Sequence, residues 1–321
     1  MTVHLYLAER VGRQLRRALA RLFDLARLTR KSLRERGMVT TFRQILTAPR
    51  RRGLRAIPAH HCPSKINEHT QPRASPGERN SVRGKMRQGA RPFINHTIIQ
   101  WKGIELIVRA ATVDRENVDW MGESLFWKLF EERPIGSRDV VLDLGAHIGS
   151  FGILASHTRG CRVVAFEPDQ ESMRLCRANA LLNGIEGRFE FVEAAVAGSD
   201  CTVQLYKAVE NWGHTILSSG GPYNLLTGES VDVPCYSLKK ALDVGTCDFC
   251  AFVKVNVEGA EFDMIEMAEE ETLNRVGALA GELHYDLVKR SPERVISKLK
   301  RANFSVHLEP AGERAFLLAW R

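Results

Sequence analysis

The fold of this chain is decided by residues 140–149, whose sequence is VVLDLGAHIG. The apolar run at its start predicts a short buried strand, and the two glycines predict a tight turn that opens a helix. A helix that begins directly after a strand points free backbone N–H groups at any ligand above the sheet edge. This stretch therefore predicts a βαβ unit that binds a ligand where its first strand ends.

The next apolar strand ends in an acid and identifies the ligand as a nucleoside. It covers residues 163–168, VVAFEP, and places Glu167 where a carboxylate can bind both ribose hydroxyls. Dinucleotide enzymes use Gly-x-Gly-x-x-Gly for a pyrophosphate, whereas this turn reads Gly145-x-x-x-Gly149 after Asp143. A negative charge at that point suits a ligand with an amino group. The pattern favours S-adenosylmethionine over NAD.

Composition is that of a cytoplasmic enzyme. The chain has 321 residues, of which 44% are hydrophobic, enough to bury a large core. No apolar run reaches the roughly 18 residues of a membrane span, and no secretory signal is recognisable at the start. The seven cysteines are an odd number and are expected to be reduced thiols. The single Cys-x-x-Cys, Cys247 to Cys250, lacks the second pair that a structural zinc needs, so no metal site is predicted.

Charge divides the chain into an arm, a linker and a body. Residues 1–92 contain 22 Lys and Arg against 5 Asp and Glu, whereas residues 93–321 contain 24 against 33. Residues 1–46 show helical apolar spacing among arginines and predict a basic amphipathic helix. Its arginine face could be solvated, bind an acidic partner or lie on the inner surface of an anionic membrane. Residues 47–92 are rich in Pro and Arg and predict a disordered linker, and residues 93–321 form the predicted methyltransferase domain.

The body alternates strands and helices, which predicts a mostly parallel sheet with right-handed crossovers. A hairpin over residues 98–107 turns at Lys102-Gly103, and a second hairpin around Gly312 makes the last strand antiparallel. Residues 197–236 are expected to form an irregular insert. The fold class is α/β, with the Rossmann-like architecture of a class I methyltransferase. The expected strands are 139–144, 162–167, 188–194, 249–255, 277–283, 304–308 and 315–320, and the expected helices are 123–131, 149–158, 170–183, 260–269 and 291–302.

Two further motifs follow later strands. Residues 253–261, VKVNVEGAE, alternate valines with polar side chains, so the polar ones share one face of the strand end. Residues 281–284, GELH, end the next strand and bring a histidine to the same edge. Carboxylates in this position can act in catalysis, or they can simply be solvated or cap a helix N-terminus.

With these motifs the chain resembles the FkbM-type methyltransferase family over about residues 93–283. The resemblance implies S-adenosylmethionine as the donor and hydroxyls of sugars or natural products as acceptors. The family usually has Asp at the position of Asn256 and Asn at the position of His147. The motifs that carry the resemblance are LDLGAHIG (142–149), FEP (166–168), WGHT (212–215), KVNVEGAE (254–261) and ELH (282–284).

Donor contacts are expected from the first two strands. The methionine part is assigned to Asp143 and to the backbone of the glycine turn, the ribose to Glu167, and the adenine to the end of the third strand. The expected donor-binding residues are Asp143, Gly145, Ala146, His147, Gly149, Glu167, Pro168 and Glu193.

Methyl transfer to an alcohol also needs a base, which an amide at position 256 cannot provide. Glu258 or His284 is the expected base, and His214 is a further candidate. Lys254 would orient the carboxylates or stabilise a developing alkoxide, and Asn256 would hold a hydroxyl or the donor by hydrogen bonds.

The sequence thus predicts an S-adenosylmethionine-dependent methyltransferase that acts on a hydroxyl of a sugar or small-molecule acceptor. Two alternatives remain. The basic arm would suit a nucleic-acid methyltransferase, although the acidic body makes that less favourable. The amide at Asn256 would suit a non-catalytic scaffold that retains the fold.

Overall fold

The structure is a computed structural model that describes residues 96–110, 112–221, 224–246 and 248–321. The predicted basic helix (1–46) and linker (47–92) lie outside the described residues, as does Cys247 of the Cys-x-x-Cys pair. None of the described helices is long and apolar enough to cross a membrane.

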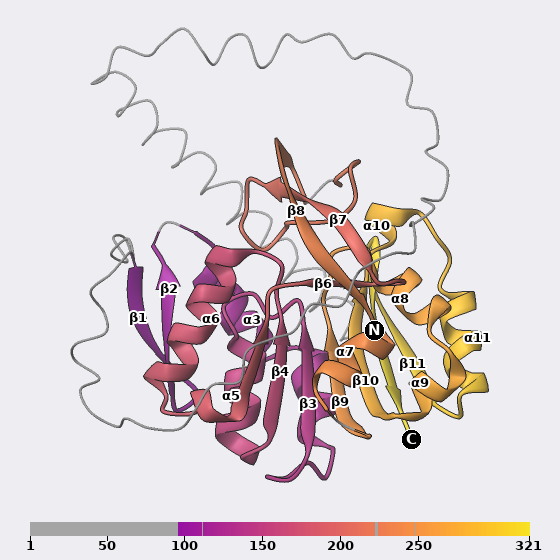
Figure 1. Cartoon of the computed structure of the whole chain (residues 1–321), viewed down its shortest axis with the longest axis horizontal. Helices are drawn as coiled ribbons and strands as arrows, with labels where there is room; N and C mark the ends of the chain where they lie inside the picture. Colours follow the sequence, from indigo (N-terminus) through magenta and orange to yellow (C-terminus); the bar gives the residue numbers. More distant parts are fainter. Residues whose placement is uncertain (1–95, 111, 222–223, 247) are drawn as a thin grey trace, which may run out of the picture. The chain divides into compact units, whose positions relative to one another are not determined.

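A seven-stranded sheet forms the centre of the domain, in the order β11-β12-β10-β9-β3-β4-β5 (Figure 1). The pairs from β10 through β5 are parallel, and β12 is antiparallel to both of its neighbours. The predicted parallel sheet with an antiparallel C-terminal strand is therefore confirmed. The strands are β3 (Val140–Leu144), β4 (Arg162–Phe166), β5 (Phe189–Val192), β9 (Cys250–Val255), β10 (Val276–Leu283), β11 (Ser305–Ala311) and β12 (Arg314–Trp320).

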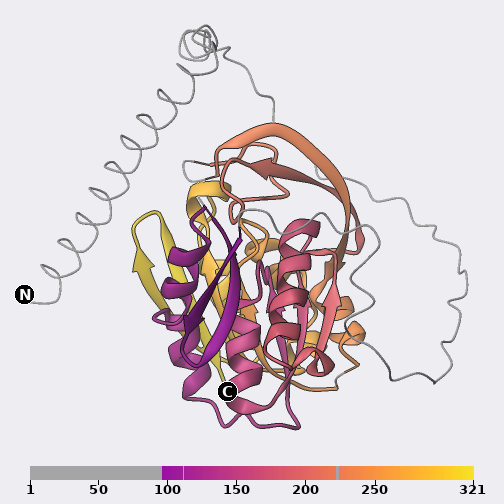
Figure 2. The same ribbon diagram turned by 90° about the vertical axis from the view of Figure 1, so that its left-hand side faces the viewer.

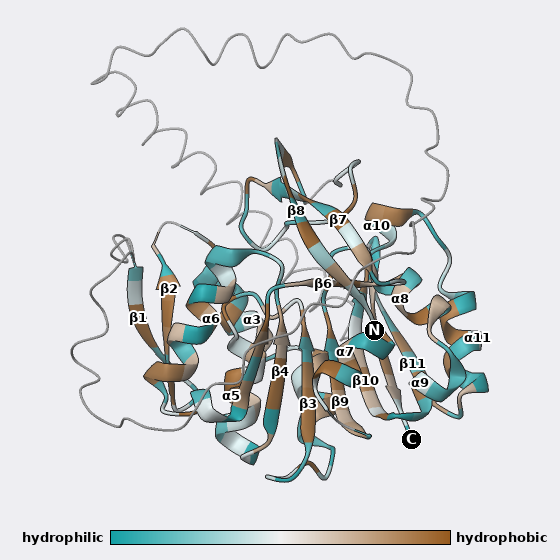
Figure 3. Cartoon of the chain, viewed as in Figure 1, coloured by the Kyte–Doolittle hydropathy of each residue, from teal (hydrophilic) through white to brown (hydrophobic). Residues whose placement is uncertain are grey.

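Helices cover both faces of this sheet, so its inner strands are apolar on both sides. All five residues of β3 are buried, and its side chains alternate between the two cores: Val141 packs with Phe151 of one layer, whereas Leu142 packs with Phe262 of the other. Apolar residues concentrate along these inner strands in Figure 3. The helices are α3 (Asp114–Met121), α4 (Leu125–Glu131), α5 (Ser150–Arg159), α6 (Gln170–Leu182), α7 (Leu238–Val244), α8 (Glu261–Met267), α9 (Glu270–Asn274), α10 (Tyr285–Val288) and α11 (Glu293–Arg301).

The predicted first hairpin is present as β1 (His96–Trp101) and β2 (Ile104–Arg109). Side-chain amides in α6 and at its C-cap bind the backbone of the β2 edge. Asn179 Oδ1 accepts from the backbone N–H of Ile107, and Asn183 Oδ1 accepts from that of Glu105. Helix α3, which follows, was not predicted, since its apolar face is short. The hairpin delivers Arg109 to the edge where the parallel strands end.

The expectation of an irregular insert over residues 197–236 was wrong. These residues form most of a three-stranded sheet of β6 (Ala195–Ala197), β8 (Leu226–Ser237) and β7 (Cys201–Ala208), in that order. Strand β8 is exposed along most of its length and contains Gly228 and Pro234, which argue against a strand. The alternation of Val231, Val233 and Cys235 with polar residues and proline was the signal that could have revealed it. Figures 1 and 2 show β7 and β8 rising above the edge at which the parallel strands of the main sheet end.

Candidate active site

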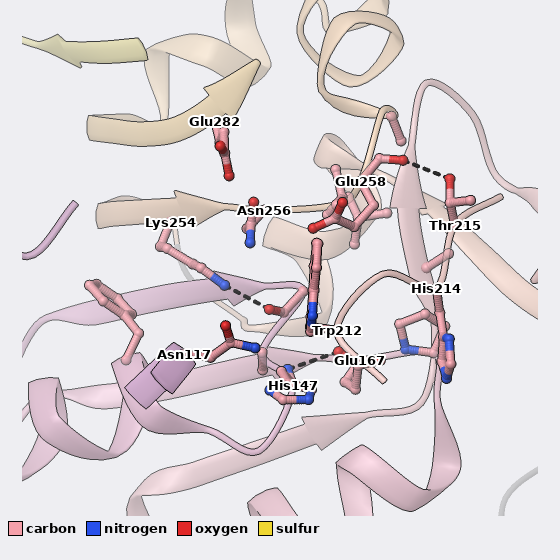
Figure 4. Close-up of a pocket in the computed structure, with 18 of the residues that line it drawn as sticks. Asn117, His147, Glu167, Trp212, His214, Thr215, Lys254, Asn256, Glu258 and Glu282 are labelled. Carbon is pink, nitrogen blue, oxygen red and sulfur yellow. Dashed lines mark hydrogen bonds between the residues drawn. The ribbon is translucent and has the colours of Figure 1, made fainter. Parts of the chain in front are cut away.

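A cavity of about 300 Å³ lies at the carboxyl ends of the parallel strands (Figure 4). Its wall includes Gly145 after β3, Glu167 after β4, Asn256 after β9 and Glu282 near the end of β10. The segment between β7 and β8 contributes Trp212, His214 and Thr215 to the same wall. Ligands of open α/β sheets bind at this edge, so the cavity is the candidate active site.

Gly145 lets the turn after β3 approach the neighbouring strand. Its φ is 73°, and a Cβ atom at this position would lie 1.9 Å from the backbone oxygen of Asn256. No other residue fits there without moving the backbone. The turn is held further by two amides, because the N–H groups of Gly145 and Ala146 both donate to the carbonyl of Phe166, each at 2.9 Å. The turn therefore has a defined shape that presents Ala146 and His147 to the cavity.

Asp143 lies beneath the turn rather than in the cavity wall, which corrects its expected contact with the donor. It is fully buried, and its Oδ2 accepts from the backbone N–H of Gly152 in α5 at 3.0 Å. Its Oδ1 forms an ion pair with Lys254 Nζ at 3.0 Å. Asp143 thus joins β3, α5 and β9 below the ligand.

Lys254 completes this buried support and also lines the cavity, so its expected role toward an alkoxide stays a prediction. Its ammonium group donates to the carbonyl oxygens of Gly145 at 2.6 Å and Leu144 at 3.3 Å, in addition to its pair with Asp143. Two of its three hydrogens are thus used by backbone carbonyls. Lys254 therefore holds in place the turn of residues 145–149 after β3, which we call the donor turn.

Glu167 faces the cavity in the orientation that the ribose assignment needs. Its Oε2 accepts from the backbone N–H of His147 at 2.8 Å, and its Oε1 from that of Asp169 at 2.9 Å. Each carboxylate oxygen has a second lone pair, so two amides position the group without exhausting it. Burial raises the pKa of Glu167 to about 7. Pro168 follows it in the wall of the cavity.

His147 is neutral and is fixed by a buried arginine that sequence reasoning missed. Burial first, and then the charge of Arg109, lower the pKa of His147 to about 4. Its Nε2 lies 2.6 Å from Arg109 Nη2, so Nε2 accepts that hydrogen bond. Arg109 is itself paired with Asp114 through Nε at 2.9 Å and Nη2 at 3.1 Å. An arginine at the end of a hairpin strand carries no sequence signal for this contact.

Two of the expected donor contacts lie elsewhere. Gly149 packs α5 on α6, because a Cβ atom there would lie 2.6 Å from Cys176 Sγ. The side chain of Glu193 is 44% exposed and pairs with Arg177 at 3.3 Å, outside the cavity. The following residues, Ala194 and Ala195, form the wall instead. Alanines offer an apolar surface to a flat base but are too common to stand out in a sequence.

Asn256 and Glu258 line the side of the cavity beyond the donor turn, which we call the acceptor side. The backbone N–H of Asn256 donates to Leu144 O at 3.0 Å, which fixes the residue next to the donor turn. Its Oδ1 is buried and accepts no hydrogen bond from the part of the chain that the structure describes. A buried polar atom in a cavity wall is a natural contact for a ligand.

The expectation that His284 acts as a base is wrong. His284 is fully buried, with Nδ1 2.8 Å from Glu261 Oε1 and Nε2 3.3 Å from Glu258 Oε2. Burial by itself would lower its pKa, but the two carboxylates outweigh burial and raise the pKa well above the ordinary value. An imidazolium has no lone pair that could accept a proton. His284 instead holds the carboxylates of Glu258 and Glu261 in place by ion pairs.

Glu258 is held in place by its ion pair with His284. Its Oε2 also accepts from Asn224 Nδ2 at 3.0 Å. Although burial would raise its pKa, His284 and Asn224 lower it below the ordinary value. A carboxylate stabilised in this way is a weak base. Glu258 therefore shapes the acceptor side of the cavity but is poorly suited to take a proton.

The third candidate base, His214, is neutral and has its lone pair occupied. Its Nδ1 accepts from the backbone N–H of Ala208 at 2.9 Å, and Nε2 lies 3.8 Å from Asp169 Oδ1. Burial lowers its pKa to about 4 despite that carboxylate. The proton therefore sits on Nε2, and His214 has no free basic nitrogen. It ties the segment between β7 and β8 to the residues after β4.

The structure adds aromatic residues on the acceptor side that were not expected there, next to Glu282 of the motif ELH. Glu282 lies in the cavity wall, and Phe316 of β12 is its partner in the strand register. Trp120 of α3 is 36% exposed, and its ring is tilted against that of Phe316 at 6.1 Å. Arg314 pairs with Asp286 at 3.0 Å. Glu282 was visible as the acid of the motif ELH, but the aromatic residues reach the cavity only through packing of α3 and β12.

The donor side of this cavity fits S-adenosylmethionine. The glycine turn allows the backbone to approach a ligand, Glu167 offers lone pairs at the position of a ribose, and the alanines after β5 leave an apolar surface for a base. The residues that would hold the donor are Gly145, Ala146, His147, Glu167, Pro168, Ala194 and Ala195.

The chain is similar to several solved structures and matches one protein family. A precorrin-6y C5,15-methyltransferase from Geobacter metallireducens aligns with 61% of this chain and 87% of its own, at 12% identity and a TM-score of 0.38. TYW2 from M. jannaschii, solved in complex with AdoMet, aligns with 70% of this chain and 84% of its own, at 12% identity and a TM-score of 0.38. A comparison with curated proteins finds no match. The sequence itself matches the family described as the methyltransferase FkbM domain over residues 143–306. The chain therefore belongs to the FkbM methyltransferase family and uses S-adenosylmethionine as its cofactor.

Proposed function

We propose that this methyltransferase methylates a hydroxyl group on an uncharged small-molecule or glycan acceptor. One observation supports this most strongly: a single cavity joins the donor turn to a compartment with carboxyl, amide and aromatic side chains. The donor turn contributes Gly145, and the compartment contributes Asn256, Glu282 and Trp120. Groups of these kinds bind and deprotonate an alcohol.

The chemistry required of the protein is modest. Bound S-adenosylmethionine supplies an electrophilic methyl group, and its carbon–sulfur bond breaks with the electron pair going to sulfur. The chain must hold the acceptor oxygen in line with that bond, which is mainly positioning. It must also receive the hydroxyl proton. The acceptor side of the cavity is built for both tasks.

The charge of the acceptor side favours an uncharged acceptor. The acidic groups in and directly behind its wall outnumber the basic groups there, and the guanidinium of Arg314 is already paired with Asp286. A phosphate group would therefore meet net negative charge in a poorly screened site. This argues against nucleic acid as the acceptor. The acidic groups are Glu258, Glu261, Glu282 and Asp286, and the basic groups are Arg314 and His284.

The aromatic wall supports a ring-shaped acceptor. Trp120 and Phe316 present apolar surface beside the carboxyl group of Glu282. An aromatic ring has a negative face, which attracts the weakly positive C–H groups of a saturated ring. An acceptor with both C–H faces and hydroxyls would match the two kinds of surface.

Methyl-labelled S-adenosylmethionine tests the proposal directly. The full chain would be incubated with neutral methyl glycosides and cyclic polyols, with their phosphate esters, and with total tRNA. We expect labelled methyl ethers from neutral acceptors only. Transfer to tRNA would instead support a nucleic-acid methyltransferase. Calorimetric binding of S-adenosylhomocysteine with no transfer to any acceptor would support a scaffold, and binding of NAD instead would contradict the donor assignment.

A further inference from the structure

The acceptor side needs a proton acceptor, and the groups first expected to provide it cannot. His284 is already protonated. The unprotonated ring nitrogen of His214 uses its lone pair to accept a hydrogen bond from a backbone amide. Asn256 carries an amide, which does not take protons at neutral pH. Glu258, the remaining expected base, has a lowered pKa and is a weak base. A better base is therefore sought on β10, the strand next to β9.

Glu282 occupies that place. It lies near the end of β10, and its neighbour Gly281 pairs with Val255 of β9, the residue before Asn256. Its side chain lines the cavity, and in Figure 4 the carboxyl group points from β10 toward the side where Asn256 lies. The carboxyl group of one strand therefore stands beside the amide of the next.

The charged groups that face Glu282 leave its oxygens available. Arg314 Nη1 lies 3.6 Å from Oε1, and His284 Nε2 lies 3.7 Å from Oε2. These distances are too long for hydrogen bonds. The carboxyl groups of Glu258 and Glu261 lie beyond His284 and oppose a further negative charge.

The balance of these surroundings makes Glu282 a stronger base than an ordinary glutamate. Burial raises its pKa most, and Glu258 and Glu261 raise it further, whereas His284 and Arg314 lower it. The net effect is a raised pKa. A base works best when its pKa approaches the working pH. This direction is opposite to that of Glu258, whose pKa is lowered.

We propose that Glu282 is the catalytic base that takes the proton of the acceptor hydroxyl, and that His284 is a positioning residue that keeps Glu258 and Glu261 away from that task. This proposal rests on the proposed function. As the acceptor oxygen forms its new bond to the methyl carbon, its O–H bond breaks and leaves the electron pair on oxygen. The proton moves to a carboxylate oxygen of Glu282, and the resulting carboxylic acid returns it to water.

Carboxyl NMR tests the protonation states without any acceptor. The full chain, labelled with ¹³C at glutamate carboxyl carbons, would be titrated beside Glu282→Gln and the control Glu309→Gln, which alters an exposed acid of β11. We expect the signal missing in Glu282→Gln to titrate above the ordinary range of a glutamate, and the signal missing in the control to be a different one. A Glu282 signal that titrates in or below the ordinary range would overturn the proposal.

Kinetics test the catalytic role with any acceptor that the labelled-donor screen yields. Glu282→Gln should lower kcat by about 10²- to 10⁴-fold and should remove the rise of activity with pH that a base produces. Affinity for S-adenosylhomocysteine should stay within about twofold of the parent, since Glu282 lies on the acceptor side. A Glu282→Gln enzyme that keeps its kcat and its pH profile would overturn the assignment.

The two proposals fail in different ways. If no neutral acceptor is methylated, the proposed function fails, while the carboxyl titration still decides whether Glu282 has the basicity that the inference requires. If methylation occurs but depends on Glu258 instead, the proposed function stands and the inference fails. Circular dichroism of Glu282→Gln and of the control Glu309→Gln would exclude misfolding as the cause of a lost activity.

Discussion

At the scale of single residues, glutamates of the same site have different properties because their neighbours differ. Glu167, Glu258 and Glu282 are glutamates of one cavity, the first two buried and the third half-buried. The pKa of Glu258 is lowered, whereas those of the other two are raised. The difference comes from their partners, because a nearby imidazolium favours the charged form whereas burial disfavours it. The same residue type can therefore bind a ribose, shape a wall or accept a proton.

Glu167→Gln tests the donor assignment. An amide oxygen can still accept from one backbone N–H, but its NH₂ group would face the other, and the charged contact with the ribose would be lost. A hydrogen bond to a charged group is worth about 1.5–3 kcal/mol, so we expect affinity for S-adenosylhomocysteine to fall by about 10- to 100-fold. Titration calorimetry would measure it, with Glu193→Gln as the control, because Glu193 points away from the cavity. Unchanged affinity in Glu167→Gln would refute the assignment.

The pH dependence of donor binding follows from the same residue. The ionised carboxylate is the form that accepts two ribose hydrogen bonds, and the pKa of Glu167 is raised to about 7. Donor affinity should therefore rise as pH increases through about 7 and level off above it. Calorimetry from pH 5.5 to 8.5 would show this, and a flat profile would contradict it. Glu167→Gln should lose the dependence.

At the scale of elements, the donor turn after β3 is in close contact with the chain after β9. Gly145 makes this contact possible, and Lys254 and Asp143 fasten it from below. The alternation of valines with polar residues in residues 253–257 predicted which side chains share a face. It did not reveal that Lys254 turns toward the donor loop, because that pairing depends on β3 lying next to β9.

Gly145→Ala tests this contact. The new Cβ atom would lie 1.9 Å from Asn256 O at a φ of 73°, so the backbone must move. We expect a loss of unfolding free energy of more than about 1 kcal/mol and a loss of donor binding. Gly184→Ala is the matched control, since its φ is 66° with nothing within 4 Å of a Cβ atom. Chemical denaturation would measure both, and equal losses in the two variants would show that the contact is unimportant.

At the scale of the whole domain, His284 joins parts of the chain that are far apart in sequence. It links the end of β10 to Glu258 before α8 and to Glu261, the first residue of α8, and Glu258 in turn binds Asn224 from the segment before β8. Removing one partner of a buried ionic cluster is strongly destabilising because charges are left uncompensated. The stability of the domain should therefore depend on the protonation of His284.

His284→Gln makes this dependence measurable. The pKa of His284 is raised in the folded state above the 6.5 of a free histidine. The folded protein thus retains a proton that the unfolded chain releases, and the stabilisation is complete below about pH 6.5 and is lost as pH rises through the folded pKa. We expect Gln to cost about 3–5 kcal/mol at acidic pH and progressively less at alkaline pH. Urea unfolding at several pH values would show it, and a cost that does not change with pH would contradict the imidazolium.

Local patterns in the sequence determined the parallel sheet, its antiparallel last strand and the donor side of the cavity. Residues 140–149 and 163–168 predicted the βαβ unit, its glycine turn and the position of Glu167, because these depend on neighbours in the chain. The hairpin around Gly312 predicted the antiparallel last strand. The resemblance to the FkbM family pointed to the same fold.

Only the tertiary structure decided the acceptor side. Whether His284 is a base or a clamp, whether Lys254 faces a ligand or a loop, and that Trp120 and Phe316 reach the cavity all depend on strands and helices that meet through packing. The roles of ionisable side chains follow from burial and from charges a few ångströms away, and one-dimensional spacing does not encode those distances.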